Sequence, residues 1–196
     1  MRTEQEYFWS NSFGDAYTKR NAGLQWRKRI PFWFDVINAT GVKSILEVGT
    51  NIGTNLKAIR EAAPAVVAFG CDVNQTALQE AVDAGLNIVE SSVFDLDKWV
   101  EPKFEMTATV GMLIHVAPAD IERAMRAIIA SSKRYVLAVE YEDEKEVEVP
   151  YRGYSERLWR RPFGRMYQDL GLKIVSEYDA PAEAFDKCRA WILEKA

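Results

Sequence analysis

The sequence is poor in the residues that build metal sites and disulfides. It has two cysteines and one histidine among 196 residues. Cys71 and Cys188 lie far apart inside apolar stretches and form no C-x-x-C pair. A zinc site or a disulfide framework would need more of these side chains than the chain offers. We therefore expect no metal, and we expect both thiols to be reduced, as in a cytoplasmic protein.

An excess of positive charge and a long apolar run are also missing. The 25 lysines and arginines are outnumbered by 29 aspartates and glutamates, whereas a nucleic-acid-binding surface needs a basic face. No apolar run approaches the roughly 20 residues of a membrane span, and the N-terminus lacks the apolar core of a signal peptide. We expect a soluble, cytoplasmic monomer or homodimer whose partner is a small-molecule substrate, without nucleic acid or membrane.

What the chain does contain is an alternation of strand and helix patterns. Short apolar runs are interrupted by stretches with the apolar spacing of amphipathic helices, and this order predicts a parallel sheet covered on both faces. Two final strand-like runs have no crossover helix between them, so they should pair antiparallel. The expected strands are 42–49, 65–73, 86–94, 105–113, 134–141, 172–179 and 188–195, and the clearest helices are 54–63, 74–85 and 118–132.

This pattern is typical of an α/β, Rossmann-like sheet of the class I methyltransferase type, with seven mostly parallel strands and an antiparallel C-terminal strand. An ordinary flavodoxin-like doubly wound domain is the alternative. Residues 1–40 are rich in aromatics and helical in pattern, and we expect them to form an N-terminal helical segment. Residues 41–196 should form the methyltransferase domain, the whole being one compact domain.

The loop after the first strand reads Glu47-Val-Gly49-Thr-Asn51-Ile-Gly53. It lacks the glycines of the G-x-G-x-x-G dinucleotide fingerprint and the G-K-[ST] of a P-loop. It resembles the E/D-x-G-x-G-x-G motif of S-adenosylmethionine-dependent methyltransferases, with Asn51 in place of the middle glycine. The resemblance implies that Gly49 and Gly53 let the backbone approach the cofactor, and that Glu47 lies near its methionine part.

Acidic residues also follow the next two strands. Asp72, beside Val73, ends the second strand, where a carboxylate can accept hydrogen bonds from ribose hydroxyls. Capping the following helix is its alternative use, although Asn74 is available for that. After the third strand, the methyltransferase resemblance implies that Asp95 receives the adenine amino group while Val93 or Phe94 packs against the ring.

Three longer segments narrow the resemblance. "FWSNSFGDAYTKRN", "VGMLIHVAP" and "VPYRGYSERLW" with "FGRM" resemble the methyltransferases associated with pseudaminic acid biosynthesis, over about residues 8–195. The resemblance implies that the N-terminal segment is a lid over the cofactor. An arginine there suits a methionine carboxylate and aromatic rings suit a sulfonium, with plain packing and solvent exposure as the alternative. The candidates are Trp9, Phe13, Tyr17, Arg20 and Asn21.

Candidates for the chemistry lie further along the chain. His115, the one histidine, follows the fourth strand and is a candidate base, since an ordinary imidazole can take a proton at neutral pH; a packing or positioning role is the alternative. Tyr151, Arg152 and Tyr154 begin a stretch that alternates arginines with aromatics and could bind an anionic substrate. Charge pairing of that stretch with the acidic residues before it is the alternative.

The sequence therefore predicts an S-adenosylmethionine-dependent N- or O-methyltransferase of a small polar metabolite. A sugar or sugar-acid intermediate of surface polysaccharide biosynthesis, nucleotide-linked or not, is the favoured substrate. An amino acid, a peptide or a natural-product intermediate is the alternative substrate. A nucleotide-binding oxidoreductase and a catalytically silent binding domain are the alternatives of a different class.

Overall fold

A seven-stranded sheet organises the computed structural model, which describes residues 2–101 and 103–196. The strand order is β3-β2-β1-β4-β5-β9-β8, and every neighbouring pair from β3 to β5 is parallel. β9 runs antiparallel between β5 and β8. The strands are β1 (Ser44–Val48), β2 (Val67–Asp72), β3 (Ile88–Glu90), β4 (Phe104–Val110), β5 (Ser132–Glu140), β8 (Leu172–Asp179) and β9 (Arg189–Lys195).

This topology confirms the predicted mostly parallel sheet with an antiparallel C-terminal strand, and it excludes the flavodoxin-like alternative, because β9 is inserted antiparallel. The chain order of the strands reverses between β1 and β4, which are neighbours. In open α/β sheets, the crevice beyond the carboxyl ends of the strands at such a reversal is where ligands bind. The fold therefore directs attention to the loops that follow β1, β2 and β4.

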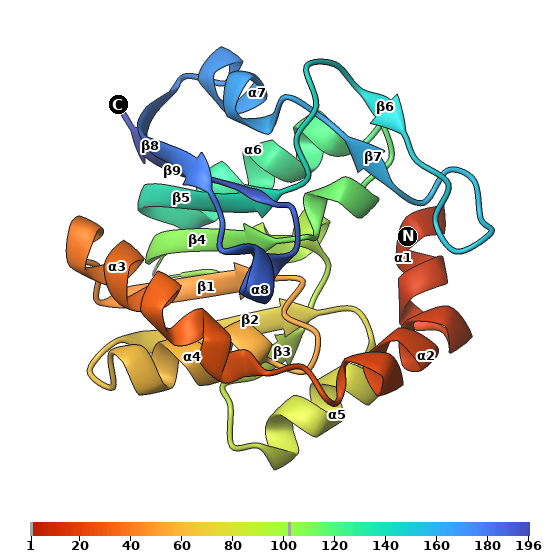
Figure 1. Ribbon diagram of the computed structural model, residues 1–196, viewed down its shortest axis with the longest axis horizontal. Helices are drawn as coiled ribbons and strands as arrows, with labels where there is room; N and C mark the ends of the chain where they lie inside the picture. The colour runs from red at the N-terminus through yellow and green to blue at the C-terminus, as the bar shows by residue number, and fades with distance from the viewer. Residues whose placement is uncertain (1, 102) are drawn as a thin grey trace.

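Helices cover both faces of the sheet (Figure 1). On one face, α3 and α4 bury Trp33, Val36 and Ile59 in a core beneath β1, β4 and β5. On the other, α6 and α7 bury Met125 and Phe163 against the same sheet. The helices are α3 (Ile30–Thr40), α4 (Thr54–Ala62), α5 (Gln75–Asp83), α6 (Ile121–Ser131), α7 (Phe163–Asp169) and the short α8 (Ala182–Phe185) between β8 and β9.

Two further parts lie at the carboxyl ends of the strands. The N-terminal helices α1 (Glu4–Ser10) and α2 (Ser12–Asn21) pack on each other, and α2 lies beside α5. The 3₁₀ turn η1 (Trp26–Arg29) follows α2. The segment between β5 and α7 forms a small antiparallel arm from β6 (Val147–Glu148) and β7 (Trp159–Arg160). No helix of the described residues is both long and apolar enough for a bilayer crossing.

The structure shortens one predicted strand. The apolar run 86–94 was expected to be extended throughout, but β3 ends at Glu90 and a 3₁₀ helix, η2 (Val93–Lys98), follows. The Ser92 hydroxyl accepts a hydrogen bond from the Phe94 N–H at 3.0 Å and caps η2. A second 3₁₀ turn, η3 (Leu113–His115), follows β4. These two turns decide which side chains face the crevice.

Candidate active site

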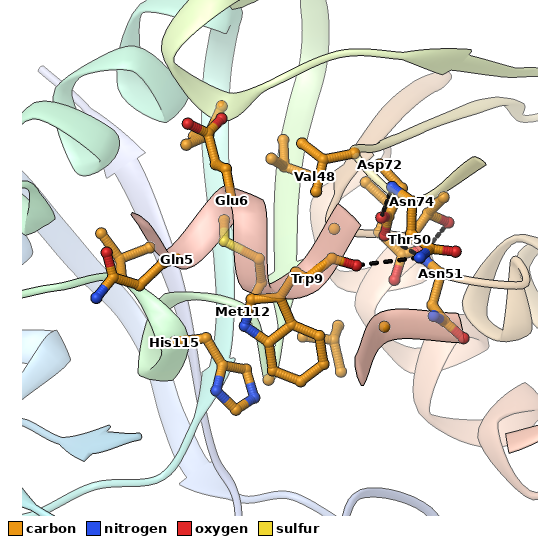
Figure 2. Close-up of a pocket in the computed structure, with 18 of the residues that line it drawn as sticks. Gln5, Glu6, Trp9, Val48, Thr50, Asn51, Asp72, Asn74, Met112 and His115 are labelled. Atoms are coloured by element: carbon orange, nitrogen blue, oxygen red, sulfur yellow. Dashed lines mark hydrogen bonds between the residues drawn. The ribbon is translucent and has the colours of Figure 1, made fainter. Parts of the chain in front are cut away.

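A cavity lies over the carboxyl ends of β1, β2 and β4, with α1 and α2 forming one wall (Figure 2). Most of the residues predicted for a cofactor site line it. These are Glu47, Gly49, Asn51, Asp72, Val73, Val93, Phe94, Trp9, Tyr17, Asn21 and His115. Gly53, Asp95, Arg20, Tyr151, Arg152 and Tyr154 are not among the lining residues. The described residues hold no cluster of His, Cys, Asp or Glu suited to a metal ion.

Glu47 is fully buried at the end of β1 and is held by two side chains. Thr50 donates its hydroxyl to Oε2 at 2.7 Å, and Asn55 donates its amide to Oε1 at 2.5 Å. Burial raises the pKa of Glu47 to about 7, against the opposing effect of these hydrogen bonds and of Arg29. A carboxyl group with this pKa is partly protonated at neutral pH, and a cation placed beside it would favour its ionised form.

Arg29 is the site residue that the sequence reasoning missed. It lines the same cavity, and its guanidinium donates to Asn55 Oδ1 at 2.9 Å and to the Ala184 carbonyl oxygen at 3.1 Å. Asn55 therefore links the arginine to Glu47, which places one positive and one potentially negative group at the end of β1. A zwitterionic amino-acid group matches that pair of charges.

Arg20, which we expected near a methionine carboxylate, lies outside the cavity. It is exposed, and its guanidinium lies over the rings of Phe13 at 5.5 Å and Tyr17 at 5.7 Å. The helical phase of α2 explains this placement. Tyr17 and Asn21 lie one turn apart on the inner side of the helix, while Arg20, the residue before Asn21, points to a different side. The arginine that lines the cavity is Arg29, which comes from η1 rather than from α2.

The loop after β1 follows the left-handed backbone that its glycines allow. The φ angles are +78° at Gly49, +49° at Asn51 and +72° at Gly53. Asparagine is one of the few residues that adopt this region readily, which explains how Asn51 replaces the expected middle glycine. Its side chain adds a tie to the lid, since its amide donates to the Thr18 hydroxyl at 3.3 Å.

Two of these glycines are also required by packing. A Cβ atom at Gly49 would collide with the side chain of Met112, and one at Gly53 would collide with Leu86. Gly49 thus lets the backbone pass close to the residues after β4, on the floor of the cavity. Gly53 is the N-cap of α4 and packs against Leu86 and Ala81, and it does not line the cavity.

Asp72 lies at the tip of β2 and accepts one backbone N–H on each carboxylate oxygen. Asn51 donates at 2.8 Å and Asn74 at 2.9 Å. Burial raises the pKa of Asp72, and these N–H groups oppose the rise. Asn74 is the cap of α5, as predicted, accepting from the Ala77 N–H at 2.8 Å. Asp72 is thereby left to line the cavity with one further lone pair on each oxygen.

Asp95 does not take the place predicted for it. Because η2 begins at Val93, the chain turns before residue 95, and the Asp95 carboxylate pairs with Lys98 at 2.7 Å on the surface. Val93 and Phe94 do line the cavity. The end of β3 therefore offers apolar walls to a ligand, but Asp95 cannot serve as the acceptor for an adenine amino group from this position.

His115 lies at the rim of η3 with its ring against Trp9, the two ring centroids being 4.4 Å apart. Its Nδ1 lies 2.7 Å from the Arg157 carbonyl oxygen, which can only accept, so Nδ1 carries the hydrogen. Burial lowers the pKa of His115 to about 4. The ring is thus neutral near pH 7 and its Nε2 has a lone pair available to take a proton.

Two buried ionisable side chains hold the turn that carries His115. Glu140, at the end of β5, accepts from the N–H groups of Met112, Leu113 and Ile114 at 3.2 to 3.4 Å. Arg161 donates to the carbonyl oxygens of Leu113 at 3.1 Å and Val116 at 2.9 Å. Both side chains are fully buried. The backbone on both sides of His115 is thereby fixed by charged groups, which the sequence pattern did not reveal.

The predicted substrate residues lie behind the lid. Tyr151 packs 5.1 Å from His115 and 6.2 Å from Trp9, measured between ring centroids. Tyr154 is half exposed and packs on Phe13 at 5.4 Å. Arg152, with a φ of +52°, is exposed on the tip of the arm. These residues join an aromatic cluster between the arm and α1–α2 and are not among the residues that line the cavity.

Comparison with known proteins places the fold. Neither a protein-family model nor a curated protein sequence matches the chain. Among solved structures, the magnesium protoporphyrin IX methyltransferase (ChlM) from Synechocystis PCC 6803 with bound SAH superposes with a TM-score of 0.75 at 10% identity, covering 97% of this chain and 98% of that chain. The 1,6-didemethyltoxoflavin-N1-methyltransferase of Burkholderia thailandensis, with S-adenosylhomocysteine bound, gives 0.74 at 14% identity, covering 97% and 87%.

A third neighbour, the mitomycin 7-O-methyltransferase MmcR, gives a TM-score of 0.72 at 13% identity, covering 99% of this chain and 61% of that chain. The chain has the class I methyltransferase fold. At these identities the likeness establishes the architecture alone. Cofactor, reaction and substrate have to be argued from the side chains of the cavity.

Proposed function

We propose that this chain is an S-adenosylmethionine-dependent methyltransferase acting on nitrogen or oxygen of a small polar molecule. The observation that supports it best is the pair of carboxyl groups at the ends of neighbouring strands beside one cavity, the buried Glu47 and the partly buried Asp72. A phosphate-binding loop would present cations and N–H groups there. Carboxyl groups suit an ammonium and ribose hydroxyls instead.

The donor set of the cavity fits this cofactor. Arg29 would hold the carboxylate of its methionine part and Glu47 the ammonium, while Asp72 would accept from the ribose hydroxyls. Val93 and Phe94 would face the purine. When bound, the cofactor supplies an electrophilic methyl group on a sulfonium. The protein's task is then to orient the acceptor and to remove its proton.

We assign the removal of the proton to His115 and part of the orientation of the acceptor to Trp9. The His115 Nε2 lone pair can take the proton that a hydroxyl or protonated amine loses on methylation. The Trp9 indole N–H is buried and has no hydrogen-bond partner within residues 2–101 and 103–196. It lines the cavity beside His115 and would donate to an oxygen of the acceptor.

For the acceptor we propose a sugar or sugar-acid intermediate first, on the resemblance carried by residues 8–21 and 110–118 and by the arm. An amino acid or natural-product intermediate is the next class to test. The mitomycin and toxoflavin neighbours act on natural products by their names. We propose a cytoplasmic location, in which the two buried, unpaired cysteines would be reduced.

Calorimetric titration with S-adenosylmethionine, S-adenosylhomocysteine and NADH tests the proposal. We expect saturable binding of the first two and none of NADH. NADH binding alone would replace the proposal with the oxidoreductase alternative, and no binding of any would favour a silent domain. A methyl-transfer assay with nucleotide-linked amino sugars, and then with free amino acids, would follow.

A further inference from the structure

Glu6, in the N-terminal helix α1, has a buried carboxylate oxygen that the protein leaves unpaired. Its side chain lines the cavity although the residue is only 9% exposed. Oε2 accepts from the Thr3 N–H at 2.7 Å, while the Thr3 hydroxyl accepts from the Glu6 N–H at 3.2 Å, a capping box. Oε1 has no hydrogen-bond partner in the part of the chain that the structure describes.

An unpaired buried carboxylate oxygen is costly unless something donates to it. The capping box fixes the orientation of the carboxylate, because Oε2 is held by the backbone. Figure 2 shows Glu6 pointing from α1 to the side of the cavity away from Trp9 and His115. The Glu6 carboxylate therefore lies on the other side of the cavity from the place proposed for the acceptor.

The start of α1 is anchored beside the end of β3. Arg2 pairs with Glu90, the last residue of that strand, at 2.6 Å. The next residues along the chain, Ser91, Val93 and Phe94, line the cavity that Glu6 lines. Across from them, Val116 and Ala117 add apolar surface to the same cavity. A flat ring between these walls would meet few polar groups.

The polar side chains that follow β3 are already engaged with one another or with the surface. Asp95 pairs with Lys98, and the Ser92 hydroxyl caps η2. The Ser91 hydroxyl accepts from the Trp99 indole at 2.7 Å and donates to the Ser92 carbonyl oxygen at 3.0 Å. Asp120, which also lines the cavity, accepts from Arg123 at 2.9 Å. Glu6 Oε1, by contrast, is buried and has no hydrogen-bond partner among the described residues.

We propose that Glu6 accepts a hydrogen bond from the exocyclic amino group of the cofactor's purine, the role that the sequence assigned to Asp95. This rests on the proposed function, and it moves purine recognition from the sheet to the lid. α1 would then hold the purine in place, and the bound purine would in turn hold α1 over the cavity. Ligands with a carbonyl oxygen in place of the amino group would be rejected, since two acceptors would face each other.

The test replaces the acceptor on the protein by a donor, and the donor on the ligand by an acceptor. Glutamine also completes a capping box, so in Glu6→Gln the amide oxygen can keep the Thr3 N–H and present its NH₂ group to the cavity. We expect the variant to bind S-adenosylhomocysteine roughly 10- to 100-fold more weakly than the wild type. We expect it to gain affinity for S-inosylhomocysteine, which carries a carbonyl oxygen at that position. Asp95→Asn, a matched carboxyl-to-amide change, should alter neither.

The outcomes separate the two proposals. Wild-type protein that binds S-adenosylhomocysteine, together with an unchanged preference in Glu6→Gln, would overturn the role of Glu6 and leave the methyltransferase proposal intact. A loss of preference in Asp95→Asn instead would return the role to the loop after β3. Wild-type protein that binds neither compound would reject the proposed function itself. Circular dichroism of Glu6→Gln would check that α1 is still formed.

Discussion

At the scale of single residues, Asp72 combines a structural and a ligand-binding position. Its two oxygens are held by the N–H groups of Asn51 and Asn74, so the carboxylate also joins the loop after β1 to the start of α5. Such pre-organisation lowers the entropy lost when a ligand binds. It also means that a substitution must be judged by affinity and stability together.

Asp72→Asn should weaken binding of S-adenosylhomocysteine by about tenfold or more, because the amide can accept on one atom only and loses the charge that strengthens bonds to hydroxyls. Isothermal titration measures this directly. Asp97→Asn, at an exposed position in η2, is the matched control and should leave affinity unchanged. Wild-type affinity in Asp72→Asn would remove the ribose role.

His115 allows a prediction with a defined sign. Burial lowers its pKa to about 4. Above that pH the ring is neutral, and its Nε2 lone pair is free to take a proton from a substrate. Turnover that depends on it should be level from about pH 5 to 8 and fall as the pH drops through the region of 4. His115→Gln should lose about 100-fold or more in kcat while cofactor affinity is kept. Near-wild-type turnover in the variant would leave His115 a packing residue.

The same pKa shift affects stability. The unfolded histidine, with its ordinary pKa near 6.5, binds more protons than the folded one between about pH 4 and 6.5. The contribution of His115 to the free energy of unfolding therefore rises with pH across that window. Urea unfolding of wild type and His115→Gln at pH 4.5 and 7 should show the difference between the two proteins changing in that direction. A pH-independent difference would contradict the shift.

At the scale of elements, η3 is the part that the rest of the site depends on. A three-residue 3₁₀ turn has little stability of its own, and here Glu140 and Arg161 satisfy its backbone from both sides. Arg161→Met should destabilise the fold by about 3 kcal/mol. The carbonyl oxygens of Leu113 and Val116 would lose their hydrogen-bond donor, and the buried Glu140 carboxyl would lose a nearby positive charge. Arg165→Met, whose ion pair with Asp169 is exposed, should change stability by about 0.5 kcal/mol or less.

Urea unfolding gives both values, and turnover of Arg161→Met measured below its unfolding range should fall more than its cofactor affinity does. Such a split would show that Arg161 positions His115. An equal loss of kcat and affinity would point to general unfolding, and no loss of stability would contradict the packing argument.

The elements also show what the sequence can and cannot predict. The strand runs, the cap at Asn74 and the glycine loop are local signals, set by backbone chemistry over a few residues, and these features were predictable. Asp95 and Arg20 were misplaced because a 3₁₀ turn and the phase of one short helix decide where they face. Arg29 lies in a four-residue turn without periodicity. The capping box of Thr3 and Glu6 was not among the predicted features, and no local pattern gives the direction of its second oxygen.

At the scale of the whole molecule, the cavity is built by segments that are distant in the sequence and joined by few polar contacts. Asn74 is central, since its amide donates to the Trp9 carbonyl oxygen and to Asp15, both at 3.0 Å, while its oxygen caps α5. Arg157 of the arm pairs with Glu4 and accepts from His115. The N-terminal helices, the arm and the sheet are thus joined by a small set of hydrogen bonds and ion pairs, and a change in one of them should alter the cavity.

Asn74→Asp tests the hydrogen bonds that join Asn74 to Trp9 and Asp15 of the N-terminal helices. Aspartate keeps the cap of α5 and suits a helix N-terminus. It presents an acceptor, however, to the Trp9 carbonyl oxygen and to the Asp15 carboxylate. In the wild type the Asn74 amide donates to Asp15 and lowers the pKa of that carboxyl group. We expect faster amide exchange in residues 4–21 and S-adenosylhomocysteine affinity reduced by about tenfold. Asn87→Asp, which also removes a bond to a carbonyl oxygen and adds the same charge at an exposed site, should show neither effect.

The pH dependence of Asn74→Asp then distinguishes a loosened lid from a damaged site. A buried aspartate beside a second carboxylate has a raised pKa, and once protonated it can again donate to the Trp9 carbonyl oxygen. Affinity in Asn74→Asp should therefore recover toward the wild-type value as the pH falls from 8 toward 5, while the wild type changes less. A deficit that stays constant over that range would mean that Asn74 acts by capping α5, and that α1 and α2 are held over the cavity by other contacts.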